Sequence, residues 1–325
     1  MSLYHRRLVS ATTRGFMFPG QGSQRVGMGR ALAEAFGAAR RVYDEVDDAL
    51  DQRLSRLMFE GPEDELTLTQ NAQPALLAVS LAATRALEAE GGFVLADKCA
   101  YVAGHSLGEY SALAAVGSLS LPDAARLLRR RGLAMQQAVP VGEGAMAALL
   151  GIDLEVAAAI VEQAGEGAVC SAANDNAPGQ VVISGARDAV MRAMAIAPDH
   201  GARRCIELPV SAPFHCSLMA PAAAVMAEAL AGTALVAPAA PLVANVTARP
   251  VTDPDEIRKH LVEQVTAMVR WRESVLFMRD AGVDSLIELG AGKVLSGLAR
   301  RIDRGLNGVS VEQPDELAAV LETLT

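Results

Sequence analysis

The chain has 325 residues, of which 51% are hydrophobic and 21% are charged, and its formal net charge is −9. This length and apolar content support a large domain with a substantial core and exclude a disordered chain. The acidic balance argues against a nucleic-acid-binding protein, because no basic patch dominates the electrostatic field.

Short apolar runs alternate with helical patterns along the first part of the chain. Residues 1–14 have no apolar signal-peptide core, and we expect a disordered tail there. The elements expected after it are a strand over 15–18, a glycine-containing loop, a helix over 26–36, a helix that Pro74 opens and that ends near 90, a strand over 99–103, and helices over 107–116 and 122–138. This alternation indicates an α/β protein with a mainly parallel sheet.

The middle of the chain has a different pattern, β-α-β-β-α-β, which is the order of a ferredoxin-like unit. Its expected elements are strand 146–150, helix 154–164, strands 168–172 and 180–184, helix 188–197 and strand 203–208. We therefore expect a small ferredoxin-like subdomain over 141–208, inserted into a discontinuous large α/β subdomain formed by 1–140 and 209–325. A ligand-binding cleft is expected between the two.

After the insert the α/β pattern resumes and continues to the end of the chain. The expected elements are a helix from 217, strand 242–246, helices 255–269 and 272–281, strand 285–289, helix 294–302, strand 308–311 and a helix from 314.

The four cysteines form no C-x-x-C pair, so the sequence predicts no metal or redox motif and favours the reducing cytoplasm. The longest uncharged stretch, residues 229–248, is rich in alanine and broken by prolines, so it is too weakly apolar to span a bilayer. We therefore expect a cytoplasmic protein that makes no membrane contact.

A nucleophile elbow is predicted where the strand over 99–103 meets the next helix. The five residues from Gly104 to Gly108 match G-x-S-x-G, which presents Ser106 on a strained turn. The backbone N–H of Leu107 can then face a developing oxyanion. The alternative is an ordinary turn with a capping serine, and the flanking strand and helix favour the nucleophile.

A serine nucleophile needs a base, and His215 is the best placed of the five histidines. It follows the expected insert in a loop that returns to the cleft, although spacing alone leaves a structural histidine open. No acid stands out as a third triad member, since only Asp175 and Glu207 lie near suggestive loops. Because hydrolases of this class place histidine late in the chain, a Ser-His dyad is expected instead of an ordinary esterase triad.

Two glycine loops fail the nucleotide-binding motifs. The loop after the first strand reads Phe-Pro-Gly-Gln-Gly-Ser-Gln over 18–24, and G-x-G-x-x-G fails at Arg25. The loop over 290–293 fails the P-loop pattern, because Ile287 stands where the first glycine is required. The first loop can instead place the backbone N–H of Gln21 in an oxyanion hole, or it is a simple helix-initiating turn.

Arg131 falls on the apolar stripe of the helix over 122–138, together with Ala124, Leu127, Leu128 and Met135. A buried arginine is costly unless an anion pairs with it, and its planar fork suits a carboxylate. Two partners fit: a carboxylate on the acyl substrate, or an internal salt bridge.

Together these segments resemble the malonyl-CoA:acyl-carrier-protein transacylases of fatty-acid synthesis and the related acyltransferase domains of polyketide synthases. The matching segments span nearly the whole chain in the family's order, over residues 18–24, 73–76, 104–113, 131–132, 135–136, 176–180, 211–216, 269–271 and 288–290. The resemblance implies a hydrolase-like core with a ferredoxin-like insert.

The resemblance also implies a ping-pong reaction. Ser106 would take the malonyl group of malonyl-CoA as an ester and pass it to the phosphopantetheine thiol of acyl carrier protein. His215 would act as the base and later as the acid, and Arg131 would hold the malonyl carboxylate. Phe214 resembles the malonyl-selecting version of its motif and would crowd an α-methyl group.

Three supporting roles follow from the same resemblance. Gln21 and Leu107 would supply the backbone N–H groups of the oxyanion hole. Gln264 would orient the histidine through its backbone carbonyl, which agrees with the missing triad acid. Met268 stands where the family commonly has proline, which weakens the assignment of Gln264.

The expected partners are malonyl-CoA and acyl carrier protein, and the protein is expected to be a monomer with no bound cofactor or metal. Because carrier proteins are acidic, a local basic patch would have to dock them. The candidates are Arg129–Arg130, Arg203–Arg204 and the cluster of Arg300, Arg301 and Arg304. Three alternatives stay open: a discrete polyketide acyltransferase, a serine hydrolase and a non-catalytic carrier-binding subunit.

Overall fold

The computed structural model describes residues 13–210 and 212–324. Most of the expected disordered tail, residues 1–12, therefore lies outside the described residues, as does Ser211 at the start of the histidine segment. Among the described residues, no helix combines the length and the apolar character that crossing a bilayer requires.

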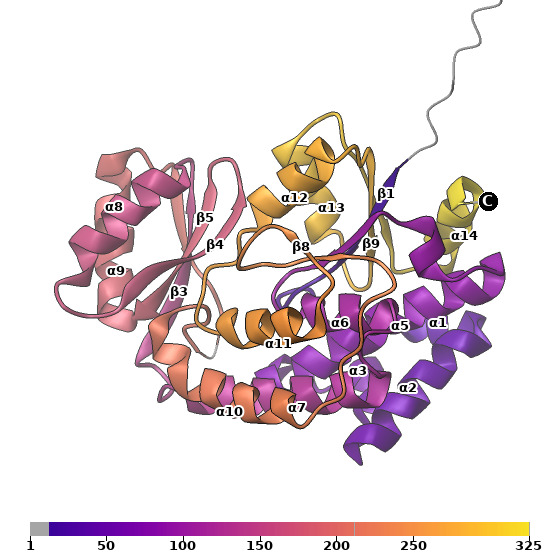
Figure 1. The fold of residues 1–325 in the computed structure, drawn as a ribbon. Coiled ribbons are helices and arrows are strands. Elements are labelled where there is room, and N and C mark those ends of the chain that lie inside the picture. The colour runs from indigo at the N-terminus through magenta and orange to yellow at the C-terminus, as the bar shows by residue number, and fades with distance from the viewer. Residues whose placement is uncertain (1–12, 211, 325) are drawn as a thin grey trace, which may run out of the picture.

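A six-stranded, mostly parallel sheet forms the centre of the larger part (Figure 1), which confirms the expected α/β class. Its order is β10-β9-β1-β2-β7-β8, and β8 alone pairs antiparallel with its neighbour. The strands are β1 (Arg14–Phe18), β2 (Tyr101–Gly104), β7 (Leu242–Val243), β8 (Pro250–Val251), β9 (Ser285–Leu289) and β10 (Asn307–Val311).

Helices cover both faces of this sheet. The side chains of β1 show this, since they alternate between two apolar clusters, one on each face. Phe16 and Phe18 pack in the cluster that contains α5, whereas Met17 packs in the cluster that contains α12 and α13. The helices of the larger part are α1 (Arg30–Ala35), α2 (Gly37–Leu50), α3 (Leu54–Glu60), α4 (Glu63–Thr67), α5 (Thr69–Gly91), α6 (Gly108–Ala115), α7 (Leu121–Gln137), α10 (Ala220–Ala231), α11 (Pro254–Glu263), α12 (Trp271–Asp280), α13 (Val294–Ile302) and α14 (Pro314–Leu324), with 3-10 turns at Leu95–Lys98 and Ser217–Met219.

The middle of the chain folds beside this part as a four-stranded antiparallel sheet with the order β4-β5-β3-β6. Its elements are β3 (Gly144–Leu150), α8 (Leu154–Gly165), β4 (Cys170–Ala177), β5 (Gln180–Ala186), α9 (Arg187–Ile196), a 3-10 turn at Ala197–His200 and β6 (Arg204–Glu207). It has a separate apolar cluster, which includes Leu149, Ile160 and Val190.

The two parts are joined near the end of β4. Asn174 forms an isolated parallel bridge with Val269, and the Asp175 carboxylate lies 2.9 Å from Arg272 at the start of α12. The segment after α11 is therefore attached to the smaller sheet.

Several expected boundaries are wrong. The first helix begins at Arg30, because Gly27 and Gly29 turn the chain with φ angles of 91° and 76°. Pro74 lies inside α5, which begins at Thr69. α2, α3 and α4 were not predicted.

Two further expected elements are shorter in the structure. The helix expected over 255–269 ends at Glu263, and Val269 donates to the Ala173 carbonyl instead of continuing it. The strand expected over 242–246 ends at Val243.

Candidate active site

Ser106 occupies a sharp turn between β2 and α6. Its φ angle of 54° lies in the left-handed region, which non-glycine residues seldom adopt. The side chain of Asn245 braces this turn: its Oδ1 accepts from the Ser106 N–H at 2.8 Å, and its Nδ2 donates to the Gly104 carbonyl at 2.7 Å. The surrounding structure thus holds the serine in a strained conformation.

The flanking glycines of this turn are required by close backbone contacts. A Cβ on Gly104 would lie 1.9 Å from the carbonyl carbon of Gly108, and one on Gly108 would lie 2.2 Å from the carbonyl oxygen of Phe18. Only glycine lets β1, β2 and α6 approach this closely, which explains the G-x-S-x-G pattern in physical terms.

Ser106 and His215 form a hydrogen-bonded pair, with 2.8 Å between the Ser106 Oγ and the His215 Nε2. The His215 Nδ1 lies 2.8 Å from the carbonyl oxygen of Gln264 and 3.1 Å from that of Ala267. Because carbonyl oxygens only accept, the Nδ1 carries the proton and the Nε2 lone pair faces the serine hydroxyl.

His215 is 4% exposed, and burial together with the nearby Arg131 lowers its pKa to about 3. The imidazole is therefore neutral at physiological pH and able to accept a proton. Two backbone carbonyls occupy the position that a carboxylate holds in a Ser-His-Asp triad.

The two acids that the sequence left open point elsewhere. Asp175 pairs with Arg272, and Glu207 pairs with Arg187 at 2.9 Å. The His105 Nε2 lies 2.9 Å from the Asn176 Oδ1, so this histidine does not serve the serine beside it. Of the remaining histidines, His5 lies outside the described residues.

Arg131 is 1% exposed and lies against the serine. Its Nη2 donates to the Ser106 Oγ at 3.0 Å and to the Gln264 Oε1 at 2.6 Å, and its Nη1 donates to the Gln73 Oε1 at 2.9 Å. Within the described ranges no carboxylate lies within 4 Å of the guanidinium, and its buried Nε has no hydrogen-bond partner. The internal salt bridge considered from the sequence is therefore not found there.

A cavity of about 440 Å³ opens above this group, between the larger part and the smaller sheet. Its walls include Gln21, Leu107 and Phe214 from the larger part, and Met146 and Asn176 from the smaller sheet. In the portion of the chain that the structure describes, the backbone N–H groups of Gln21 and Leu107 donate to no other group. Both amides can thus serve a ligand in this cavity.

Sequence reasoning missed three polar residues around the site, namely Gln73, Glu109 and Asn245. Glu109 is buried on the first turn of α6, and burial raises the pKa of its carboxyl group to about 7. Gln73 and Glu109 each had a local signal, since they lie in the motif segments over 73–76 and 104–113. Asn245 acts across 139 residues of sequence, which no local pattern reveals.

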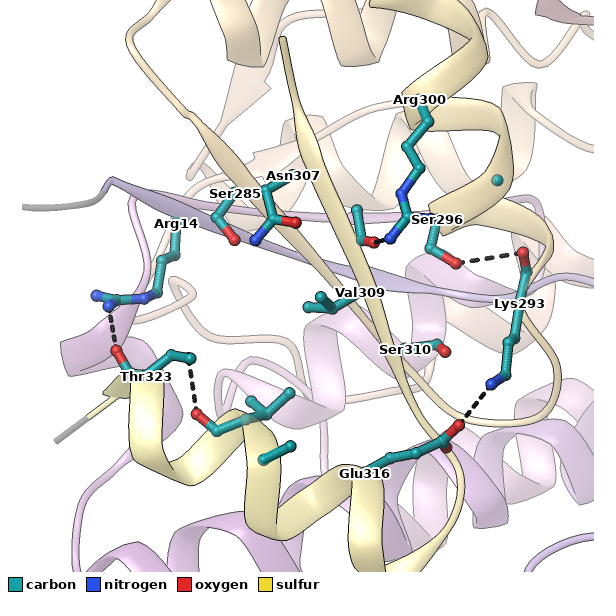
Figure 2. Close-up of a pocket in the computed structure, with 14 residues that line it drawn as sticks. Arg14, Ser285, Lys293, Ser296, Arg300, Asn307, Val309, Ser310, Glu316 and Thr323 are labelled. Atoms are coloured by element: carbon teal, nitrogen blue, oxygen red, sulfur yellow. Dashed lines mark hydrogen bonds and ion pairs between the residues drawn. The ribbon is translucent and has the colours of Figure 1, made fainter. Parts of the chain in front are cut away.

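A larger cavity of about 720 Å³ lies along the edge strand β10 (Figure 2). Its charged side chains are already engaged: Lys293 lies 2.6 Å from Glu316, Arg300 donates to the Gly308 carbonyl, and Arg14 donates to the Thr323 carbonyl. Groups that could hold a metal, meaning three or more His, Cys, Asp or Glu side chains, were not found in the described ranges. The Ser106 cavity is therefore the candidate active site.

Comparison with known proteins gives consistent matches. Residues 15–313 match the family model described as "Acyl transferase domain". The chain is 45% identical to the malonyl CoA-acyl carrier protein transacylase of Bacillus subtilis (strain 168) over 310 residues, which are 95% of this chain and 96% of that protein.

Two solved structures are also close to this one. The acyl-carrier-protein-S-malonyltransferase of Bartonella henselae is 53% identical, with a TM-score of 0.94 over 96% of this chain and 99% of that one. A malonyl-transacylase in complex with a type II PKS acyl-carrier protein is 41% identical, with a TM-score of 0.92 over 96% and 99% of the two chains.

Proposed function

The chain belongs to the acyl transferase domain family, and from that membership we propose that it transfers the malonyl group of malonyl-CoA to the phosphopantetheine thiol of acyl carrier protein. It is an acyltransferase of the acyl-carrier-protein S-malonyltransferase class, with a role in fatty-acid biosynthesis. The observation that carries the substrate assignment is the buried guanidinium of Arg131, which lies 3.0 Å from the Ser106 Oγ and has no carboxylate within 4 Å among the described residues.

The first half-reaction acylates the serine. The Ser106 Oγ attacks the thioester carbonyl of malonyl-CoA while the His215 Nε2 accepts the hydroxyl proton. The N–H groups of Gln21 and Leu107 stabilise the tetrahedral oxyanion. When this intermediate collapses, the C–S bond breaks, and His215 returns its proton to the departing CoA thiolate.

The second half-reaction repeats these steps with a different attacking group. The carrier's phosphopantetheine thiol gives its proton to the His215 Nε2 and attacks the ester carbonyl. The C–O bond to Ser106 then breaks, and the serine oxygen recovers the proton from His215. One histidine serves both halves, because each half moves one proton from an attacking group to a leaving group.

Arg131 would select the acyl group. Its planar fork can bind the malonyl carboxylate with charge-assisted hydrogen bonds. An acetyl group offers no such partner and would leave a buried guanidinium without an anion. We assign Gln264 to orienting His215, which its carbonyl contact of 2.8 Å supports even with Met268 in place of the family's proline.

We further propose that residues 1–140 and 209–325 form a hydrolase-like core and that residues 141–208 form a ferredoxin-like insert. The β-α-β-β-α-β order and the strand order β4-β5-β3-β6 of the smaller sheet support this division. The monomeric state, the cytoplasmic location and the absence of nucleic-acid and membrane contacts stay predictions. Size-exclusion chromatography with light scattering and cell fractionation would test the first two.

A discrete polyketide acyltransferase is the second candidate. The observation that favours it is the similarity to a malonyl-transacylase that binds a type II PKS carrier. Comparing kcat/KM for a fatty-acid carrier and a polyketide carrier would separate the two pathways. A serine hydrolase is less well supported, because carbonyl oxygens, and no carboxylate, contact the His215 Nδ1 in the described structure.

Mixing the protein with malonyl-CoA and the phosphopantetheine-bearing carrier tests the proposal. We expect the carrier to gain a malonyl group and free CoA to appear in equal amount. The Ser106→Ala and His215→Ala variants are each expected to lose about 10³-fold or more in rate. Release of malonate and CoA with no loaded carrier would overturn the proposal in favour of a hydrolase.

A further inference from the structure

Glu109 lies behind the reacting groups and is not among the residues that line the cavity. Its carboxylate is 1% exposed and accepts two hydrogen bonds. The Gln264 Nε2 donates to its Oε2 at 2.5 Å, and the backbone N–H of Asn245 donates to its Oε1 at 2.7 Å. Among the described residues no cation lies within 4 Å of it, so its direct hydrogen-bond partners are neutral donors, and Arg131 acts on its charge from a longer distance.

Resting on the proposed malonyl transfer, we infer that Glu109 is a positioning residue that fixes the Gln264 side chain so that its carbonyl oxygen faces Arg131. Gln264 would then hold the guanidinium ready for the malonyl carboxylate. Glu109 itself touches neither the substrate cavity nor the reacting atoms.

The orientation of the Gln264 amide follows from the groups around it. Its Nε2 has two acceptors, the Glu109 carboxylate and the Ser106 carbonyl at 3.1 Å. Its Oε1 has one donor, the Arg131 Nη2, at 2.6 Å. The flipped amide would set its NH₂ group against a guanidinium that only donates and its oxygen against two oxygens. The carboxylate therefore acts together with the guanidinium and the Ser106 carbonyl to exclude it.

The indirect contact also leaves the arginine available to the substrate. In the part of the chain that the structure describes, the acceptors on the Arg131 terminal nitrogens are neutral amide oxygens and a hydroxyl. A carboxylate placed directly on these nitrogens would compete with malonyl. Burial lowers the pKa of Arg131, and electrostatic interactions with Tyr110 and with Glu109 oppose that effect. Glu109 thus balances the buried cation without occupying its fork.

A purely structural role for Glu109 makes a different prediction. Through Asn245 it also supports the turn that carries Ser106, and weakening that turn would slow malonyl and acetyl transfer alike. A role through Gln264 and Arg131 affects malonyl selectively, because acetyl has no carboxylate for Arg131 to bind. The ratio of the two acylation rates therefore separates the roles.

The Glu109→Gln variant is the main test. The side chain of a glutamine at 109 would have one carbonyl oxygen for two donors, the Asn245 N–H and the Gln264 Nε2. The Asn245 N–H belongs to the backbone and cannot rotate, so it would keep the oxygen. The new amide would therefore present its NH₂ group to Gln264 and favour the flipped form. We expect single-turnover acylation of Ser106 by malonyl-CoA to fall by about 10- to 100-fold, the loss of one hydrogen bond to a charged group, and acylation by acetyl-CoA to fall much less.

Two variants accompany it. Glu109→Asp still offers only acceptors and should keep more of the malonyl preference than Glu109→Gln does. It also provides the test if Glu109→Gln does not fold. Glu288→Gln is the matched control, because Glu288 is also a buried carboxylate that accepts two hydrogen bonds. Its donors are the backbone N–H groups of Leu295 and Ser296. We expect it to leave the malonyl-to-acetyl ratio unchanged.

An unchanged ratio in Glu109→Gln would overturn the inference, and so would an equal change in Glu288→Gln. If Glu109→Gln does not fold, the test is made with Glu109→Asp. The inference would be overturned if Glu109→Asp lost the malonyl preference as completely as Arg131→Ala does. Wild-type protein that forms no malonyl ester on Ser106 would instead overturn the proposed function. The two failures are therefore distinguishable.

Discussion

His215 meets two backbone carbonyls where a triad would supply a carboxylate. Carbonyl dipoles fix the tautomer of the ring but stabilise an imidazolium less than a full negative charge does, and the nearby Arg131 opposes that cation. Such a weak base suits thioester exchange, because thiols ionise near pH 8.5 and leave more readily than alkoxides or amines. The attack of the carrier thiol and the departure of CoA therefore need little from this base, whereas the serine hydroxyl needs the most from it.

The first prediction concerns pH. Since the folded pKa of His215 is lowered to about 3, the rate of acylation by acetyl-CoA, which does not use the Glu109–Gln264–Arg131 chain to bind a carboxylate, should be flat from about pH 5 to 8, with loss only as the pH falls further toward that pKa. Arg131→Gln removes one cause of the lowered pKa, so the acid limb should move to higher pH. Rapid-quench acylation with acetyl-CoA measures both profiles, and a wild-type inflection near pH 6.5 would contradict the assignment.

The second prediction concerns Arg131→Ala. Loss of charge-assisted hydrogen bonds to the malonyl carboxylate should lower malonyl acylation by about 100-fold or more and raise the relative rate with acetyl-CoA. Arg130→Ala is the matched control, because Arg130 lies on the same helix, is exposed and pairs with Glu228 at 3.1 Å. If the acyl preference of Arg131→Ala equals that of wild type, the carboxylate role is wrong.

At the scale of elements, the turn between β2 and α6 depends on how closely three backbones approach. Gly108 lies against the carbonyl of Phe18 at the end of β1, so the loop that carries Gln21 and the helix that follows Ser106 meet there. The two proposed oxyanion donors come from these two segments. Their spacing is thus set by the same contact that requires glycine.

The third prediction tests that contact. Gly108→Ala should lower the free energy of unfolding by about 3 kcal/mol or more, because its Cβ would overlap the Phe18 carbonyl. Gly297→Ala is the control. It is exposed inside α13, and apart from its chain neighbours and the nearby backbone of its own helix, no atom of the described residues lies within 4 Å of the added Cβ, so the substitution should stabilise by about 0.5–1 kcal/mol. Urea unfolding measures both, and equal effects would refute the close-approach explanation.

Local patterns predict some elements better than others. β9 and α13 have the expected bounds, because an apolar run and an amphipathic stripe there are each bounded by clear breaks. α5 is buried on nearly all sides, so periodicity could not locate its start, and Pro74 was misleading. α2 was missed although Val42, Tyr43 and Val46 lie on one buried face at helical spacing.

The residues of the candidate site also differ in how well local sequence patterns predict them. Ser106 and Arg131 are visible locally, one in a five-residue motif and the other on a helical stripe. The roles of Glu109 and Asn245 depend on partners more than 130 residues away, which only the folded chain brings together. Sequence reasoning therefore named Ser106, His215, Arg131 and Gln264, which the structure brings together, and missed Glu109 and Asn245 beside them.

At the scale of the whole molecule, an acidic chain must dock an acidic carrier. With a net charge of −9 the long-range field is repulsive, so local cations are needed. Arg203 and Arg204 are exposed, form no ion pair within 4 Å among the described residues, and lie just before the cavity-lining segment over 208–210. Arg130 is paired with Glu228, and Arg300 and Arg301 are bonded within the chain.

The fourth prediction follows from this difference. Reversing Arg203 and Arg204 to Glu should raise the KM for carrier protein by about tenfold, with little change in acylation by malonyl-CoA, and the effect should shrink at high salt. The same reversal of Arg40 and Arg41 on α2 is the control, since it changes the net charge equally. Equal effects of the two reversals would show a role for net charge alone.

The central claim is that Ser106 carries the malonyl group between the two thiols. The most direct measurement is the intact mass of the protein after brief mixing with malonyl-CoA, before and after addition of carrier protein. The account predicts one malonyl adduct that the carrier removes and that Ser106→Ala does not form. An adduct that persists with the carrier present, or that forms equally in Ser106→Ala, would contradict it.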